Sequence, residues 1–97
     1  MNTTNKISKF IENALFKAEK SNSLPKIKIQ KIIVEKPRNK DFGNWSSNIA
    51  MVLAKELKQN PMDIAQVISE NIEINDDIES IKIVKPGFIN FDLSEKF

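Results

Sequence analysis

The segment from Asp41 to Lys58 constrains the fold most, because it combines a turn, a helix cap and an amphipathic helix. Gly43 can adopt a positive φ angle without steric cost, and Ser46, Ser47 and Asn48 each carry a side-chain oxygen that can cap a helix. The apolar residues that follow recur at helical spacing, with two alanines among them: Ile49, Ala50, Val52, Leu53, Ala54 and Leu57. The pattern predicts a helix with one face in the core.

The turn before this helix is unusual, because Phe42 and Trp45 bracket it. A tryptophan in a turn needs either a pocket or a ligand for its large apolar ring.

A second helix is predicted to begin almost immediately after the first. Asn60 can cap it, Pro61 suits the first helical position, and Asp63 places a carboxylate in the first turn. Its apolar stripe consists of Ile64, Val67, Ile68 and Ile72. A tight helix–helix corner therefore lies near Gln59.

The N-terminal segment predicts a third helix, capped by Thr3 or Thr4 and ending near Ser21. Its core-facing stripe consists of Ile7, Phe10, Ile11, Ala14, Leu15 and Ala18.

Two strands are predicted between the N-terminal helix and the helix of the Asp41–Lys58 segment. Residues 26–34 alternate apolar and basic side chains, with a shift of phase near Gln30 that indicates a bulge or a break. Pro37 ends this strand because it cannot donate to a ladder. Arg38 to Asp41 is a polar connection, and a short strand is expected over residues 42–46.

The C-terminal segment predicts a hairpin. Residues 75–77 form a turn, residues 80–84 form a strand, residues 85–87 form a second turn, and residues 88–93 form the last strand.

Successive side chains of a strand point to opposite faces, which divides the residues of the last strand into two sets. Ile89, Phe91 and Leu93 share one face, so Phe88 and Asn90 are expected to point outward together. An aromatic plane beside an amide suits an unstacked base, which needs a surface to stack on and a hydrogen-bonding partner. The alternative is that Phe88 packs under a loop.

These elements predict a single α+β domain over residues 1–97. The expected architecture has two layers: a four-stranded, mainly antiparallel sheet, and about three helices on one of its faces. The other face is left for a partner.

Composition excludes several classes of function. The chain has no cysteine and no histidine, which removes thiolate chemistry and the commonest general base and metal ligand. Its two glycines form no phosphate loop, and its carboxylates lack calcium-loop spacing, so we do not expect this chain to be an enzyme by itself. With no apolar run long enough for a membrane span and no secretory signal, we expect a cytoplasmic protein that does not contact membranes.

Charge is distributed unevenly along the chain. Residues 1–60 hold 12 basic and 5 acidic side chains, whereas residues 61–97 hold 3 and 8. A basic half fits a polyanionic partner, although a lysine-rich solvated surface gives the same composition. Arg38 is the only arginine among the 15 basic residues. Because guanidinium groups are the usual readers of base edges in duplex DNA, we do not expect DNA to be the partner.

Four segments taken together carry a family resemblance: residues 34–37, residues 42–55, Asn60-Pro61 with Ile64-Ala65, and residues 86–91. In this order and spacing they resemble the N-terminal additional domain of arginyl-tRNA synthetases, over roughly residues 5–95. The resemblance implies an α+β domain that precedes a catalytic domain and contacts the D-loop, at the elbow of arginine tRNA. It also implies that Phe88 and Asn90 hold a D-loop base, with Lys85 at the same edge.

The chain departs from the family in two places. Phe42-Gly43-Asn44 stands where many relatives have His-Gly-Asp, a turn that we interpret as structural. The adenylate-binding signature of the catalytic domain needs His-x-Gly-His, and this chain has no histidine. The resemblance therefore implies that the catalytic and anticodon-binding domains lie outside this chain. The parent synthetase would use ATP, Mg²⁺, arginine and tRNA in protein biosynthesis.

Two alternatives remain on the sequence alone. The chain could be a protein-interaction module anchored by the Phe42–Trp45 corner, or an unrelated RNA-binding domain of similar fold. For an RNA partner, the candidate phosphate contacts are Lys26, Lys28, Lys31, Lys36, Arg38, Lys40, Lys82 and Lys85.

Overall fold

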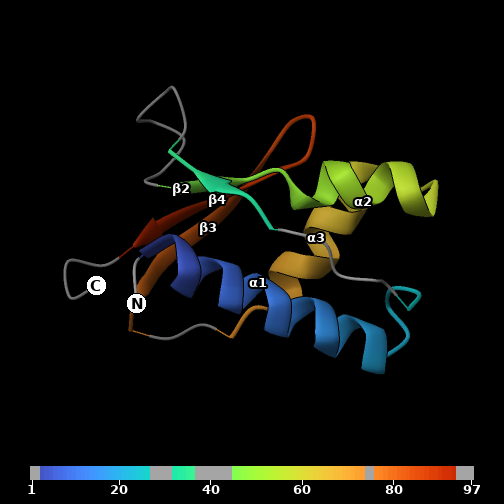
Figure 1. Cartoon of the computed structure of the whole chain (residues 1–97), viewed down its shortest axis with the longest axis horizontal. Coiled ribbons are helices and arrows are strands. Elements are labelled where there is room, and N and C mark those ends of the chain that lie inside the picture. Colours follow the sequence, from blue (N-terminus) through green and yellow to red (C-terminus); the bar gives the residue numbers. More distant parts are fainter. Residues whose placement is uncertain (1–2, 27–31, 37–44, 74–75, 94–97) are drawn as a thin grey trace.

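The computed structural model describes residues 3–26, 32–36, 45–73 and 76–93, which form three helices and four strands (Figure 1). In chain order the elements are α1 (Thr3–Lys20), β1 (Val34–Glu35), β2 (Trp45–Ser47), α2 (Ile49–Leu57), α3 (Pro61–Asn71), β3 (Ile78–Val84) and β4 (Phe88–Leu93). The strands form one antiparallel sheet in the order β1-β2-β4-β3. The predicted α+β class and four-stranded sheet are confirmed.

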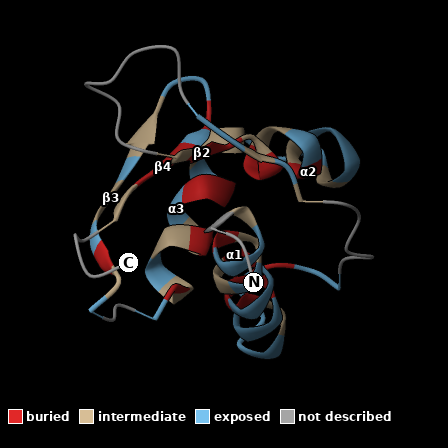
Figure 2. Cartoon of the chain, turned by 60° about the vertical axis from the view of Figure 1, so that its left-hand side comes forward, coloured by how far each residue is buried: buried red, intermediate tan, exposed pale blue. Residues whose placement is uncertain are grey.

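The core lies between the sheet and the helices. Figure 2 shows the buried residues gathered on the inner sides of α1 and α3 and along β4. The buried apolar side chains are Ile7, Ile11, Ala14, Leu15, Ala18, Leu24, Ile49, Ala50, Leu53, Ile64, Ala65, Ile68, Ile72, Ile78, Ile89 and Phe91. The predicted stripe of α1 is thus confirmed, with Phe10 packed at its margin. Within the described ranges, no helix has the length and apolar character needed to cross a bilayer.

The corner between α2 and α3 forms as predicted. Lys58 ends α2 in the left-handed conformation, with φ of 54°, and its backbone N–H donates to the Ala54 carbonyl. The Asn60 side-chain oxygen then accepts a hydrogen bond of 2.8 Å from the Met62 backbone N–H, and Pro61 occupies the first turn of α3. The end of α2 and the start of α3 thus each form a hydrogen bond to a backbone group that would otherwise lack a helical partner. The chain can therefore pass from one helix to the next within three residues, Lys58 to Asn60.

Of the three candidate caps of α2, Ser47 bonds to the start of the helix: its hydroxyl accepts from the Ile49 N–H at 3.3 Å. Asn48 precedes the helix but makes no capping hydrogen bond with its side chain. One prediction about the core face of α2 needs correction. The helical spacing predicts Val52 on the core stripe, yet it is 41% exposed. Helix α2 packs through Ile49 and Leu53 against α3 and β4, so Val52 lies on its outer side.

Residues 27–31 of the strand predicted over residues 26–34 lie outside the described ranges. Among the described residues of this segment, Ile32 and Ile33 are not in a strand, and β1 begins at Val34. Val34 and Glu35 pair with Ser47 and Ser46 of β2. Ile32 packs against the core without joining a ladder. The short strand expected over residues 42–46 lies at Trp45–Ser47 in the structure, and residues 42–44 are outside the described ranges.

The hairpin of β3 and β4 confirms the prediction, with β3 beginning two residues earlier than expected. Ile81 lies opposite Phe91 and Ile83 opposite Ile89, which places these residues on the face that meets the helices. In the turn between the strands, Gly87 has a φ of +157° and packs against Pro61 at the start of α3.

We predict that Gly87→Ala will lower the free energy of unfolding by about 1–3 kcal/mol, because L-residues rarely adopt this φ. An added Cβ would also lie 2.9 Å from the Cβ of Pro61 and 3.1 Å from the Cγ of Met51. Urea denaturation measures the change. The neighbouring exposed residue provides the control, since Lys85→Ala should alter stability by less than about 0.5 kcal/mol. Equal stability of the two variants would show that the contact with α3 is unimportant.

Removing the cap of α3 should also be measurable. Asn60→Ala deletes the acceptor for the Met62 N–H and should lower the free energy of unfolding by about 1 kcal/mol. Asn60→Asp retains an oxygen acceptor and should remain within a few tenths of a kcal/mol of the wild type. If both variants unfold at the same urea concentration, the side-chain bond does not stabilise the corner.

An exposed ion pair joins α1 to the chain just after α3. The Lys17 ammonium donates to the Glu73 carboxylate. This hydrogen bond, together with the positive charge of Lys17, lowers the pKa of Glu73 below its ordinary value. Because both groups are exposed to solvent, the pair stabilises the fold only weakly and salt screens it.

We predict that Lys17→Ala will raise the pKa of Glu73 toward its ordinary value. In the wild type the lowered folded-state pKa means that the carboxylate stabilises the fold above its unfolded-state pKa. This contribution is lost as the pH falls through the folded-state pKa. An NMR titration of the Glu73 carboxyl measures the shift, with Lys9→Ala on the same helix as the control. A Glu73 carboxyl that titrates identically in all three proteins would contradict the pairing.

Candidate nucleic-acid interface

The face of the sheet away from the helices follows from strand register. Ser46 of β2 lies opposite Asn90 of β4, and Asn90 lies opposite Lys82 of β3. Along β4, Phe88 and Asp92 share this face with Asn90, since successive side chains alternate between faces. We call this surface the open face, and its central members are Ser46, Lys82, Phe88 and Asn90.

Phe88 lies on the open face as predicted and is 37% exposed. Its ring is not part of the apolar cluster between sheet and helices. It lies immediately after the turn that Gly87 fixes against α3, so the helical layer positions the backbone from which the ring projects. A partly exposed ring on a regular strand is a rigid stacking surface.

Asn90 lies on the expected face, but the prediction that it is exposed beside Phe88 is wrong. Only 3% of Asn90 is exposed, and its side-chain oxygen accepts a hydrogen bond of 2.7 Å from the Ser46 hydroxyl. Strand β4 is central in the sheet, so a short carboxamide there lies between side chains of both neighbouring strands. The local sequence pattern does not identify Ser46 as the partner of Asn90, because strand pairing across 44 residues supplies this contact.

The structure brings only some of the predicted basic residues to the open face. Lys82 and Lys85 are exposed, one directly opposite Asn90 and the other in the turn that leads to Phe88. Lys36 follows β1, which β2 separates from β4, so the structure does not bring it together with Phe88. Arg38 and Lys40 lie outside the described residues, as do Lys28 and Lys31, while Lys26 is exposed in the loop after α1.

Trp45 does not occupy a turn, which corrects the interpretation made from sequence. It lies in β2 opposite Phe91, and it packs against the core while remaining partly accessible. The Lys36 ammonium lies 5.6 Å from the centre of its ring, which is a cation–π distance. Trp45 therefore has intramolecular partners of its own.

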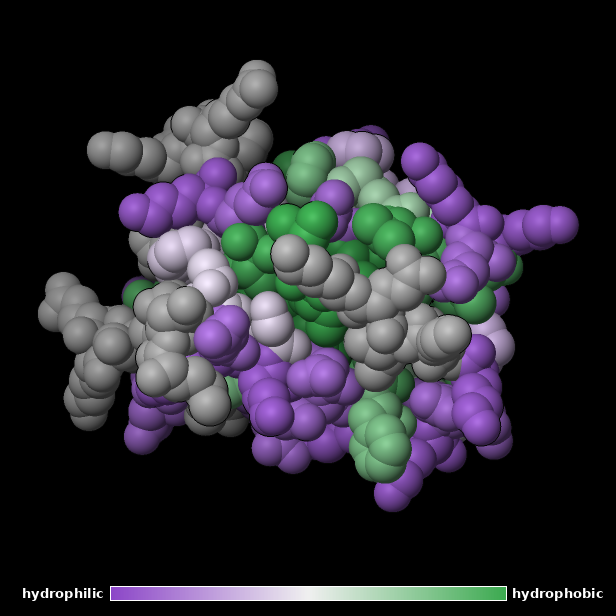
Figure 3. Space-filling model, viewed as in Figure 1, coloured by the Kyte–Doolittle hydropathy of each residue, from purple (hydrophilic) through white to green (hydrophobic). Residues whose placement is uncertain are grey.

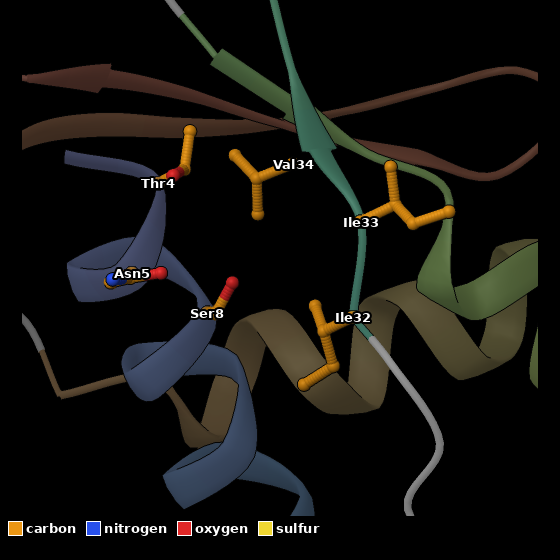
Figure 4. A pocket seen from close by; sticks show the side chains of 6 residues that line it. All are labelled: Thr4, Asn5, Ser8, Ile32, Ile33 and Val34. Carbon is orange, nitrogen blue, oxygen red and sulfur yellow. The ribbon is translucent and has the colours of Figure 1, made fainter. Parts of the chain in front are cut away.

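The open face is distinct from the hollow shown in Figure 4, which lies between the first turns of α1 and β1. This hollow has a volume of about 320 Å³, and Thr4 and Ser8 face Ile32 and Val34 across it. It contains none of the predicted site residues. Within the described ranges, no cluster of three or more carboxylates could hold a metal ion.

The fold and this site together define a class: an α+β domain whose helices cover one face of a sheet, with the partly exposed Phe88 ring and Lys82 on the other face beside the carboxylates of Glu35 and Asp92. The chain matches the family described as the arginyl tRNA synthetase N terminal domain over residues 3–93, and it belongs to that family.

Related proteins agree with this assignment. Arginine–tRNA ligase of Mycoplasma mobile is 48% identical over 89 residues, which are 91% of this chain and 16% of the ligase. The ligase of Desulforamulus reducens is 38% identical over 91 residues, which are 93% of this chain and 16% of the ligase. The chain thus spans about one sixth of the length of these relatives.

Solved structures show the same fold. Arginyl-tRNA synthetase from Plasmodium falciparum superposes with a TM-score of 0.76 at 31% identity, over 96% of this chain and 16% of that one. Arginyl-tRNA synthetase from Thermus thermophilus gives a TM-score of 0.75 over 98% of this chain and 14% of that one. Identity to the Thermus enzyme is 22%, so this comparison concerns the fold alone.

Proposed function

We propose that this chain is a tRNA-binding domain of an arginine–tRNA ligase, and that its open face contacts the D-loop of arginine tRNA. The observation that carries the proposal is the Phe88 ring, which is 37% exposed on the face opposite the helices in a member of this family. A base that has left its stack in a tRNA loop can pack on such a ring.

The other residues of the open face have separate roles in the proposal. Asn90 would hydrogen-bond the edge of the stacked base. Because only 3% of Asn90 is exposed, the base must displace neighbouring side chains before it reaches the carboxamide. Lys82 and Lys85 would contact phosphates on either side of the base, and their long flexible side chains can follow the backbone.

The remaining chemistry is assigned to other parts of the proposed ligase. ATP, Mg²⁺ and arginine would bind a catalytic domain of the same polypeptide, and a further domain would bind the anticodon. This chain would act as a single domain that adds a contact at the tRNA elbow, in the cytoplasm, without activity of its own.

We predict that Phe88→Ala will weaken binding of arginine tRNA by about 1–3 kcal/mol, the usual contribution of stacking on one base. The melting temperature should change little, because the ring is not part of the core cluster. Fluorescence anisotropy at low salt measures the binding. Phe16→Ala is the matched control: this ring is 55% exposed on α1, with the Lys20 ammonium 4.6 Å from its centre. Unfolding of the Phe88 variant, or equal binding by both variants, would remove Phe88 from the site.

A protein-docking function is the second candidate, and exposed apolar side chains just before β1 and on α2 favour it. Ile33 is 43% exposed and Val52 is 41% exposed. Figure 3 shows apolar surface gathered over β1 and α2, with hydrophilic surface around it. A gel-shift titration separates the two functions. A protein-docking module shows no salt-dependent tRNA binding, whereas a tRNA-binding domain loses affinity steeply as salt rises. An unrelated RNA binder would bind RNA without preferring arginine tRNA.

A further inference from the structure

Charged side chains are unevenly distributed over the open face. Strand register aligns one row of four residues across the sheet, from β1 to β3: Glu35, Ser46, Asn90 and Lys82. Residues directly opposite on neighbouring strands project to the same face. Because neighbouring strands lie about 4.8 Å apart, the backbones that carry the Glu35 carboxylate and the Lys82 ammonium are roughly 14 Å apart. The row therefore has a negative end at β1 and a positive end at β3.

A second carboxylate bounds the open face along β4. Phe88 and Asp92 point to this face near opposite ends of the strand, about 13 Å apart by strand geometry. Lys85 lies in the turn just before Phe88. Asp92 lies opposite Ser80, whose hydroxyl donates to the Asp92 carboxylate at 3.2 Å. The lysines thus lie around the corner that holds Phe88, and the carboxylates lie at the far edge and the far end of the face.

The lysine next to Glu35 does not offset this arrangement. The Lys36 ammonium lies 5.6 Å from the centre of the Trp45 ring. Trp45 projects to the helical side of the sheet, as Phe91 opposite it does. Within the described ranges, neither Glu35 nor Asp92 forms a salt bridge. The negative charge of both carboxylates therefore remains available to act on a ligand of the open face.

This distribution of charge decides how RNA can lie on the sheet. On other open four-stranded sheets, aromatic side chains stack two or three bases of a continuous single strand. A strand that ran from Phe88 toward β1, or along β4, would bring its phosphates to Glu35 or Asp92. Like charges repel over a Debye length of about 8 Å at physiological salt. A single base that projects from a folded loop needs only the ring and the lysines beside it.

We propose that Glu35 and Asp92 are specificity-determining residues that confine RNA to the corner of the open face around Phe88. They admit one base that projects from a folded loop, and they repel a continuous single strand that would cross the sheet. The inference rests on the proposed function, because it assumes that RNA binds at Phe88. Neither carboxylate contacts the bound base. Each acts by repelling the phosphates of an unsuitable partner, which is a general source of specificity.

The experiment compares two RNA probes at fixed low salt: an arginine tRNA transcript and an unstructured oligouridine of about a dozen nucleotides, within the usual range of site sizes. Fluorescence anisotropy gives both dissociation constants, and the measured quantity is the ratio of the oligouridine constant to the tRNA constant. The wild type should bind the tRNA more tightly. For Glu35→Gln combined with Asp92→Asn we expect this ratio to fall about three- to tenfold, because two partly screened repulsions are removed.

A matched control separates local repulsion from net charge. Glu12→Gln combined with Glu56→Gln also removes two carboxylates, from exposed positions on α1 and α2 in the helical layer. In this control the ratio should stay within about twofold of the wild-type value, because these charges are distant from the open face and screened. Adding Phe88→Ala to the open-face variant should abolish its gain in oligouridine binding, since the stacking surface is lost.

A single substitution keeps the test decisive if the combined open-face variant does not fold. Glu35 is exposed at the edge of the sheet, and glutamine has nearly the same shape. Glu35→Gln alone should lower the ratio about two- to threefold.

The failures of the two proposals are distinguishable. Wild-type protein that does not bind tRNA overturns the proposed function and this inference with it. Binding of tRNA that depends on Phe88, with a ratio that the open-face substitutions leave unchanged, overturns the inference alone. The same holds if the control on α1 and α2 lowers the ratio as much as the open-face variant, or if the wild type binds oligouridine as tightly as tRNA.

Discussion

The pairing of β2 with β4 is the contact on which the rest of the structure depends. It joins three residues of each strand, Trp45–Ser47 and Ile89–Phe91, that are far apart in the sequence. On the helical side this pairing places Trp45 opposite Phe91 and Ser47 opposite Ile89. On the other side it forms the bond from Ser46 to Asn90. A slip of one residue in this register would exchange the two faces, so core packing and the open face are specified together.

Local pattern was sufficient for much of the fold because the relevant signals lie within a few residues of each other. The stripe of α1 repeats at helical spacing over its whole length, and Asn60 with Pro61 defines the start of α3 by backbone chemistry alone. Alternation in β4 correctly separated Ile89 and Phe91 from Phe88. Each of these predictions concerns one element and its nearest neighbours, which is the range over which propensity and periodicity act.

The errors share a different cause. Val34 and Glu35 form a strand only because β2 lies beside them, and alternation over residues 26–34 cannot show how far that partner extends. The exposure of Asn90 likewise depends on strand order. On an edge strand, a residue that faces away from the helices has a neighbouring strand on one side only. Strand β4 is central, so Asn90 has neighbouring strands on both sides. The partner of Asn90 comes from 44 residues away, so no local signal identifies Ser46.

If the open face binds tRNA as proposed, the small binding free energy that its residues supply implies that it acts as part of a larger interface. One stacked base contributes about 1–3 kcal/mol, whereas a dissociation constant of 1 μM requires about 8 kcal/mol. Lys82 and Lys85 add phosphate contacts whose contribution falls as salt rises. A contact of this strength is useful when other contacts already hold the tRNA nearby, since binding then becomes intramolecular and the effective concentration is high. The relatives, in which the matching region is about one sixth of the polypeptide, have the length to supply such contacts.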